Sequence, residues 1–205
     1  MAQLVESPIV EESFTLIDQE FGAHDLTPAE YAVVRRVIHS TADFDFKHLV
    51  SFSPGAIAAG LGAMQSGCPI LVDVTMVRQG IVSMVQRTFQ NPLLTAISLV
   101  ETAAPGRTRT ETGLLQGLAQ APEAIVVIGN APTALLSLCD QIEAGAARPA
   151  LVVGAPVGFV AVEVAKQRLA QLATPQIRVE GRKGGSAVAA AIVNALLVMA
   201  RNQMP

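Results

Sequence analysis

One histidine is distinguished by its place in the sequence. His39 lies where the apolar periodicity that begins after Thr27-Pro28 runs out, so we expect it in the last turn of a helix. A helix C-terminus favours a protonated imidazole, and Asp43 and Asp45 follow closely enough to favour it further. A histidine that stays protonated near neutral pH can act as an acid. From position alone, a histidine that only caps its helix is the alternative.

Carboxylate and guanidinium groups mark two further places. Asp73 ends an apolar run, where a carboxylate either belongs to a site at the edge of a sheet or caps the next helix. Arg107 and Arg109 follow a later apolar run, where an arginine fork suits a carboxylate ligand, with a solvated loop as the alternative. We interpret His24 and His48 as structural or solvated.

Three short apolar runs in the second half of the chain end in glycine, and a helix-like segment follows each one. Short buried strands that alternate with helices predict a parallel sheet. Glycine allows a close approach of the backbone, and the free N–H groups of a helix N-terminus suit an anion. We therefore expect one anion-binding rim at the carboxyl ends of the strands. Its three segments are Gly129 to Thr133, Gly154 to Gly158 and Gly181 to Ser186.

The segments before this rim are predicted from capping and periodicity. A helix from Pro8 to Phe21 has Ile9, Val10, Ile17 and Phe21 on its apolar face and ends at Gly22. A capping box of threonine and glutamate, at residues 27 and 30, opens the next helix. We expect strands at 49–52, 69–74, 95–100, 124–128, 151–153 and 177–179, helices at 53–67, 110–118 and 187–200, and a loop at 103–109.

Composition bounds the class of protein. The chain has 205 residues, a net charge of −3 and 51% hydrophobic residues, so we expect one α/β domain over residues 1–205, with the helical segment 1–50 packed on its core. There is no basic stripe for nucleic acid. Two cysteines and an acidic, polar start predict a cytoplasmic protein without a signal peptide. The apolar stretch from Ala187 to Ala200 is shorter than the roughly 20 residues of a membrane span.

Several common sites are not indicated. No histidines or cysteines stand at metal-ligand spacing, and no Gly-x-Ser-x-Gly elbow is present. The phosphate-loop and dinucleotide-binding glycine patterns are also missing. Chemistry alone therefore predicts an α/β protein with a strand-end site for an anion.

Several blocks of sequence, taken in order, resemble the precorrin-8X methylmutase family. The match runs from about Ser7 to Leu197. It implies a flavodoxin-like fold, three α/β/α layers with a mostly parallel central sheet. The blocks are Val37 to Ser40, Phe52 to Pro54, Gly67 to Ile81, Ile128 to Leu135, Gly154 to Val160 and Gly181 to Ala187.

The resemblance implies a step of corrin-ring (cobalamin) biosynthesis, in which a methyl group moves from C-11 to C-12 of precorrin-8X or cobalt-precorrin-8. It implies a homodimer that needs no cofactor and no added metal, binds a tetrapyrrole, and hands its product to the next enzyme. Neither a nucleic acid nor a membrane partner is expected. The alternatives are a non-catalytic tetrapyrrole carrier and a nucleotide- or phosphosugar-binding α/β enzyme.

The resemblance also assigns roles to residues. His39 matches the catalytic proton donor, and Arg109 matches a hydrogen-bonding arginine, with Arg107 as the alternative. Some relatives carry threonine where this chain has Val82, so Ser83 is the alternative hydroxyl. The residues expected at the substrate are Arg109, Asp73, Met76, Gly80, Ser83, Gly129, Asn130, Thr133, Gly154, Gly158, Arg182, Lys183, Gly184, Gly185 and Ser186.

Overall fold

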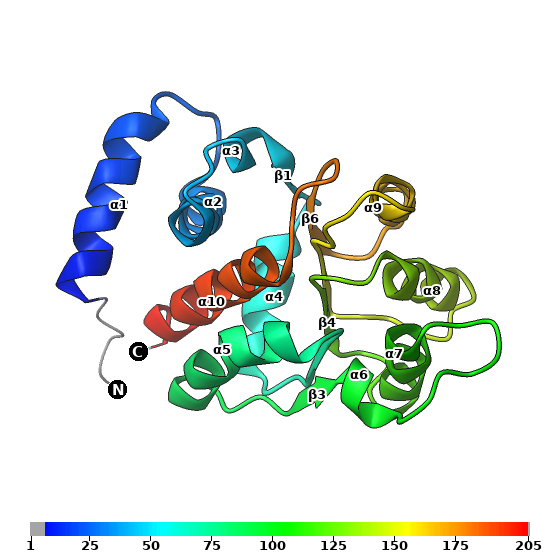
Figure 1. The fold of residues 1–205 in the computed structure, drawn as a ribbon. Coiled ribbons are helices and arrows are strands. Elements are labelled where there is room, and N and C mark those ends of the chain that lie inside the picture. The colour runs from blue at the N-terminus through cyan, green and yellow to red at the C-terminus, as the bar shows by residue number, and fades with distance from the viewer. Residues whose placement is uncertain (1–6, 205) are drawn as a thin grey trace.

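The computed structural model describes residues 7–204 and has a mixed α/β architecture. Its helices and strands alternate along most of the chain (Figure 1). The strands are β1 (Val50–Phe52), β2 (Ile70–Val72), β3 (Leu93–Thr95), β4 (Ile125–Ile128), β5 (Leu151–Gly154) and β6 (Gln176–Val179). The helices are α1 (Pro8–Phe21), α2 (Pro28–Thr41), α3 (Phe46–Leu49), α4 (Ala56–Gln65), α5 (Thr75–Arg87), α6 (Ala96–Leu99), α7 (Arg109–Gln120), α8 (Pro132–Glu143), α9 (Val162–Ala170) and α10 (Ser186–Asn202).

The strands form one sheet in the order β1-β6-β5-β4-β2-β3. Strands β2 to β6 are parallel to their neighbours, and β1 pairs antiparallel with β6 at one edge. Without β1, this is the strand order of flavodoxin-like folds, in which the chain reverses its direction of winding between β2 and β4. The predicted fold is therefore confirmed, and the switch point between β2 and β4 is where a ligand site is expected.

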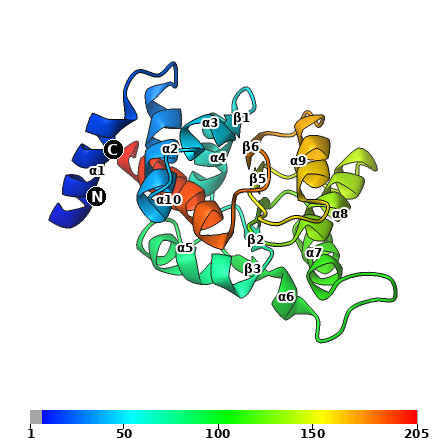
Figure 2. The ribbon, with the colours of Figure 1, turned by 45° about the horizontal axis from the view of Figure 1, so that its top comes forward.

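Helices cover both faces of the sheet. Helices α4, α5 and α10 pack in one hydrophobic cluster with one face, and α7, α8 and α9 pack in a second cluster with the other. Helix α2 packs against α10, and α1 lies outside α2, so these two helices add a further layer on one side (Figures 1 and 2). Within the described part of the chain, no helix is both long and apolar enough to cross a membrane.

Two capping boxes set where α2 and α7 begin. The Thr27 hydroxyl accepts from the Glu30 amide, and the Glu30 carboxylate accepts from the Thr27 amide, as the sequence predicts. Thr108 and Glu111 form an equivalent box that our sequence analysis missed. As a result, Arg109 is the first residue of α7, and not part of the predicted loop.

Two predictions about elements are wrong. The run from Thr95 to Val100 does not form a strand, because β3 ends at Thr95 and the chain turns at once into α6. Helix α6 packs against α7, where Ala96 is buried with Leu114 and Leu118, and an apolar run this short does not distinguish a strand from a helix. The prediction that Ile9 lies on the buried face of α1 is also wrong, because Ile9 is 76% exposed, whereas Ile17 and Phe21 of that helix are buried.

The contact between α6 and α7 makes a stability test possible. A Cβ at Gly113 would lie 1.8 Å from the Ala96 carbonyl oxygen, so Gly113→Ala must push α7 away from α6. We expect it to lower the free energy of unfolding by about 1–3 kcal/mol or more, measured by urea titration. Gly62→Ala in α4 is the matched control, because a Cβ there meets nothing within 4 Å. It should raise stability by roughly 0.5–1 kcal/mol, and equal effects of the two changes would contradict the packing argument.

Candidate active site

The carboxylate of Asp73 joins the ends of the two strands at the switch point. It follows β2 and is fully buried. One of its oxygens accepts from the backbone amides of Asn130 and Ala131 after β4, at 2.7 and 2.9 Å, and the other accepts from Val74 at 2.9 Å. Burial raises the pKa of Asp73, and the amide donors that surround it act in the opposite direction. Asp73 therefore acts as an internal clamp.

This clamp corrects the prediction for the first glycine segment. The amides of Asn130 and Ala131 were expected to bind an external anion, but the Asp73 carboxylate occupies them. A Cβ at Gly129 would lie 2.7 Å from Val77 Cγ2 and 3.0 Å from Ser186 Cα. Gly129 is thus required for packing between β4, α5 and α10, and not for the approach of a ligand.

The second and third glycine segments lie against each other. The Gly158 amide donates to the Arg182 carbonyl at 3.2 Å, and the Gly185 amide donates to the Ala155 carbonyl at 2.8 Å. Gly184 has a φ of +151°, and a Cβ there would lie 2.4 Å from the Ala155 oxygen. The loops after β5 and β6 therefore form one unit beside the N-terminus of α10 (Figure 2). Gly154 is again a packing residue, since its Cβ would meet Leu169 at 2.6 Å.

A buried lysine holds the loop that follows β6. Lys166 of α9 is 1% exposed, and its ammonium donates to the carbonyls of Gly181 and Lys183 at 2.8 and 2.7 Å. Burial lowers the pKa of Lys166 to about 8, while the charges of Glu180 and Glu163 raise it. Sequence analysis missed this role, because a lysine within a helix gives no signal that its amine is buried.

The basic side chains of the same loop already have acidic partners. Lys183 Nζ lies 2.6 Å from carboxylate oxygens of both Asp43 and Asp45, and its hydrogen bond lowers the pKa of Asp43. Arg182 Nε lies 3.1 Å from Glu163, beside the Phe159 ring. Lys183 thus binds both of the carboxylates that the sequence suggested as support for His39. Through this contact they connect the segment after α2 to the loop after β6.

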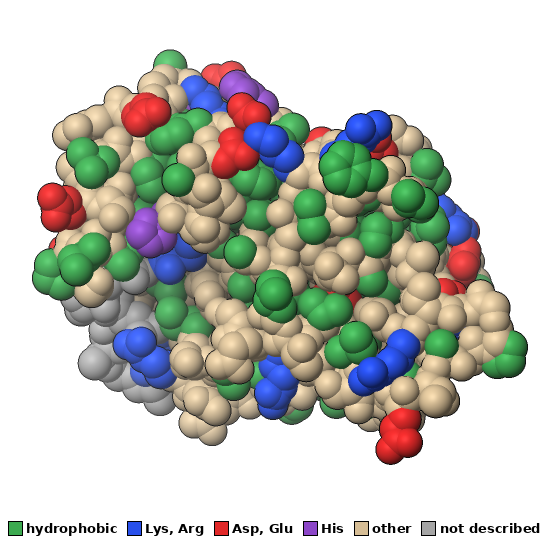
Figure 3. Space-filling view, viewed as in Figure 1, with side chains coloured by type: hydrophobic (Ala, Val, Ile, Leu, Met, Phe, Trp, Pro, Cys, Tyr) green, Lys and Arg blue, Asp and Glu red, His purple; other side chains and the backbone are tan. Residues whose placement is uncertain are grey.

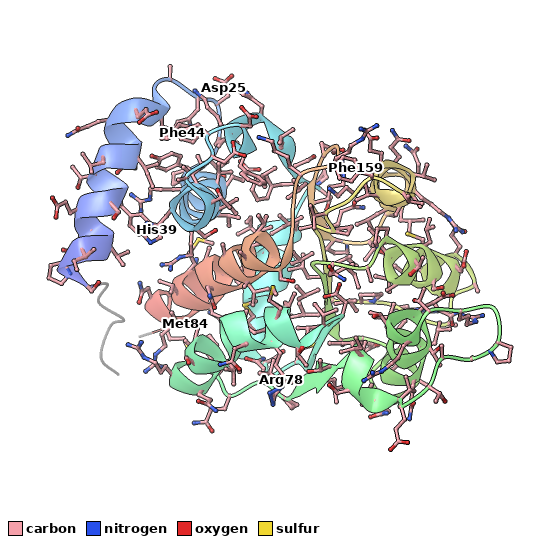
Figure 4. The ribbon with its side chains drawn as sticks, viewed as in Figure 1. Asp25, His39, Phe44, Arg78, Met84 and Phe159 are labelled. Atoms are coloured by element: carbon pink, nitrogen blue, oxygen red, sulfur yellow. The ribbon has the colours of Figure 1, made fainter. Side chains whose placement is uncertain are left out.

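His39 lies in the last turn of α2, as predicted, and is partly exposed. Figure 4 places it on the side of α2 that faces α1. Its ring meets the Phe14 ring of α1 edge to face, with 5.4 Å between the centroids. His24 differs, because it stacks on Tyr31 at 4.6 Å and contacts Phe21, which fits the structural interpretation.

Arg109 and Arg107 have different surroundings. Arg109 is exposed, and its guanidinium donates to the carbonyls of Ile97 at 2.7 Å and Val100 at 3.1 Å, at the C-terminal end of α6. Arg107 pairs with Glu111 at 3.2 Å. Thr108, between them, lies 3.1 Å from Thr133 at the start of α8, hydroxyl to hydroxyl. Arg109 and Thr133 therefore lie in the same region, where α6 ends and where α7 and α8 begin.

The residues predicted on α5 are all exposed, and one of them also lies at the contact with α10. Met76 is 71% exposed at the first turn of the helix, and Ser83 is also exposed. A Cβ at Gly80 would lie 2.6 Å from Ala190 Cβ, so Gly80 lets α5 pack closely on α10. Asn194 of α10 also donates to the Gly80 carbonyl at 2.9 Å.

Exposed apolar side chains accompany this edge of the sheet. Phe159 and Val160, in the loop after β5, are 83% and 85% exposed, and Val164 is 60% exposed. In Figure 3 hydrophobic side chains are spread over the middle of this face, and most charged side chains lie toward its margin. Sequence analysis did not list Phe159 and Val160 as site residues, although an apolar pair next to glycine in a loop is a usable signal. Within residues 7–204, no cluster of side chains suited to a metal ion is found.

The strand order and the switch-point clamp define a doubly wound α/β protein, a class in which ligands bind at the carboxyl ends of the strands. Residues 8–199 match the family model described as precorrin-8X methylmutase. A cobalt-precorrin-8 methylmutase from Synechocystis sp. is 57% identical, covering 96% of this chain and 97% of that protein. A precorrin-8X methylmutase from Pseudomonas aeruginosa is 38% identical over 92% of this chain and 93% of its own length. A crystal structure of the Thermus thermophilus precorrin-8X methylmutase superposes with a TM-score of 0.89 at 45% identity, covering 95% of this chain and 96% of that one.

The chain belongs to the precorrin-8X methylmutase family, whose members are isomerases of cobalamin biosynthesis. The family resemblance stated from the sequence is confirmed, and so is the enzyme class.

The buried amine of Lys166 leads to a prediction about how the free energy of unfolding depends on pH. Lys166→Met leaves the Gly181 and Lys183 carbonyls without their donor, and we expect a loss of about 1–3 kcal/mol in the free energy of unfolding. The native pKa of about 8 lies below the ordinary value of 10.5, so between these values the unfolded chain binds a proton that the native chain lacks. The stability of the unmodified protein relative to the variant should therefore rise from pH 8 to pH 10 in urea titrations. A difference that falls or stays flat over this range would contradict the assignment.

Proposed function

We propose that this protein moves a methyl group from C-11 to C-12 of precorrin-8X or cobalt-precorrin-8, giving hydrogenobyrinate or cobyrinate. Full-length similarity to named methylmutases supports this reaction. Cobalt, where present, is carried by the substrate. We also propose that the chain acts in the cytoplasm and hands its product to the next enzyme. The packing of α2 on α10 supports treating residues 1–205 as one domain.

The chemistry requires little from the protein. Substrate and product are isomers: the bond from the methyl group to C-11 breaks, the bond to C-12 forms, and no atom is gained or lost. A proton placed on the macrocycle redistributes its π electrons and lowers the barrier, and it must return to its donor afterwards. One positioned acid is sufficient, and general acid catalysis contributes roughly 10²- to 10⁴-fold.

We assign the acid to His39, and its position is the observation that supports the assignment. It lies at the C-terminal end of a 14-residue helix, partly exposed and held by one ring contact. The imidazole is thus available to a bound ligand, whereas His24 is stacked on Tyr31.

The substrate carries several carboxylates, and the sheet edge offers groups to bind them. Arg109 and Arg182 are exposed cations there, and the first turn of α10, from Ser186, offers backbone amides. Lys183 contributes if a substrate carboxylate shares it with Asp43. Asp73 acts indirectly, by fixing the ends of β2 and β4. The rest of the proposed contact surface comprises Met76, Gly80, Ser83, Asn130, Thr133, Gly158, Gly184 and Gly185, whereas Gly129 and Gly154 are buried and act only through packing.

Two alternatives make different experimental predictions. A tetrapyrrole carrier needs the carboxylate contacts but not His39, and a nucleotide- or phosphosugar-binding enzyme would not bind the macrocycle. Purified protein is mixed with a large excess of metal-free or cobalt-containing substrate while the visible spectrum is followed. A spectral change that continues through many turnovers supports the mutase. A spectral change that stops at one equivalent of substrate per protein chain supports the carrier. An unchanged spectrum argues against both the mutase and the carrier.

The role of His39 gives a direct prediction. His39→Asn removes the proton donor, and we expect kcat to fall roughly 10²- to 10⁴-fold with the thermal midpoint and ligand binding preserved. His48→Asn is the control, because that residue is an exposed histidine on α3, and it should keep the rate of the unmodified enzyme. If His39→Asn turns over within a few-fold of the unmodified enzyme, the assignment is wrong.

We also propose a homodimer whose interface helps to close the site. Phe159 and Val160, and Val164 in the helix that follows, are exposed apolar side chains that are costly to leave in water. Permanent interfaces are large and hydrophobic, often above about 2,000 Å² in total. A flat macrocycle is also too large to be enclosed by one open sheet edge, so the second subunit would cover part of it.

Sedimentation at low micromolar concentration tests the assembly. We expect a species near twice the chain mass of 21.4 kDa. Val160→Asp places a charge among the exposed apolar side chains and should shift the protein toward the monomer, with reduced activity. A fully active monomer of the unmodified protein would refute both the dimer and the shared wall.

A further inference from the structure

Helices α1 and α2 run antiparallel and meet in a series of side-chain layers. In the first layer the Phe21 ring packs on the Tyr31 ring, with 4.8 Å between centroids. In the second, Asp18 accepts from the Tyr31 hydroxyl and pairs with Arg35 at 3.0 Å. Each layer is about one helical turn from the next, since residues four apart lie on the same helix face.

The last of these layers contains Phe14 and His39. Phe14 is one turn before Asp18 on α1, and His39 is one turn after Arg35 on α2. The Phe14 and His39 rings lie 5.4 Å apart at 71°. The Arg35 guanidinium lies over the Phe14 ring at 4.2 Å from its centroid. The ion pair with Asp18 thus holds Arg35 beside Phe14, and Phe14 contacts the histidine.

We propose that Phe14 is a positioning residue that fixes the orientation of the His39 imidazole. The inference rests on the proposed role of His39 as the acid. A histidine at the end of a helix can rotate about χ1 and χ2, and only part of that range directs a ring N–H at a bound macrocycle. An edge-to-face contact restricts the rotation. Small errors in the placement of a catalytic group are costly, since misplacement by about 1 Å can reduce a rate 10²-fold.

The charged groups around Phe14 come from both helices. A groove of about 380 Å³ lies beside Phe14, between α1, α2 and the end of α10. Its charged lining side chains are Glu11 and Asp18 from α1 and Arg35 and Arg36 from α2, and α10 contributes uncharged residues. The Phe14 ring thus contacts both the guanidinium groups of α2 and the His39 imidazole.

The test compares variants at position 14. Phe14→Leu keeps an apolar side chain but removes the ring, and we expect a roughly 3- to 10-fold lower kcat with KM within twofold. Phe14→Tyr and Phe14→Trp keep a ring and should restore kcat. Leu16→Ala is the control on the same helix, because Leu16 is 61% exposed, and it should change nothing. Phe14→Met replaces Phe14→Leu if the latter does not fold.

A spectroscopic readout separates positioning from stability. The Cε1–H resonance of His39, assigned by its loss in His39→Asn, carries a ring-current shift that should disappear in Phe14→Leu and persist in Phe14→Tyr. A kcat within twofold of the unmodified enzyme for Phe14→Leu overturns the inference. So does a lowered thermal midpoint accompanied only by a higher KM. Activity retained by His39→Asn would instead refute the proposed function, so the two failures are distinguishable.

Discussion

The geometry of the sheet edge depends on the buried carboxylate of Asp73. The chain reverses its winding between β2 and β4, and the two strand ends must stay together for the loops to form one surface. Hydrogen bonds from Asn130 and Ala131 to a single carboxylate oxygen achieve this. A buried carboxylate costs free energy unless donors satisfy it, so the arrangement is stable only when β2, β4 and the start of α8 are all in place. The clamp therefore ties the site to the completed fold.

The remaining edge of the sheet is fixed in a similar way from within the protein. The Lys166 ammonium binds two carbonyls of the loop after β6, and Gly184 lets that loop lie against Ala155. Backbone groups that were predicted to bind a ligand are thus used to build the loops. What remains for a ligand is the surface of those loops: exposed arginines, the first turn of α10 and apolar side chains such as Phe159.

The sequence predicted the fold better than the details of the site. The capping box at Thr27 fixed the start of α2, and the glycine-ended runs identified three parallel strands. Predictions from local sequence patterns were wrong where tertiary contacts determine the structure. The apolar run after Thr95 becomes α6 because Gly113 lets α7 approach it, and neither residue reveals the other in the sequence. Glycine at a strand end predicts a close approach, but whether a ligand or a helix approaches depends on the packing of α5 and α10.

The proposed acid and the proposed carboxylate contacts lie in different layers of the molecule. His39 belongs to the helical layer outside α10, and the strand-end loops belong to the α/β core. Lys183 connects them, because it joins the loop after β6 to Asp43 and Asp45, just beyond the end of α2. Lys183 and Asp45 are exposed and Asp43 is partly exposed, so the connection is weak and is screened by salt. A substrate carboxylate that competes for Lys183 would loosen this connection as it binds, which makes the contact between α1 and α2 the firmer support for the histidine.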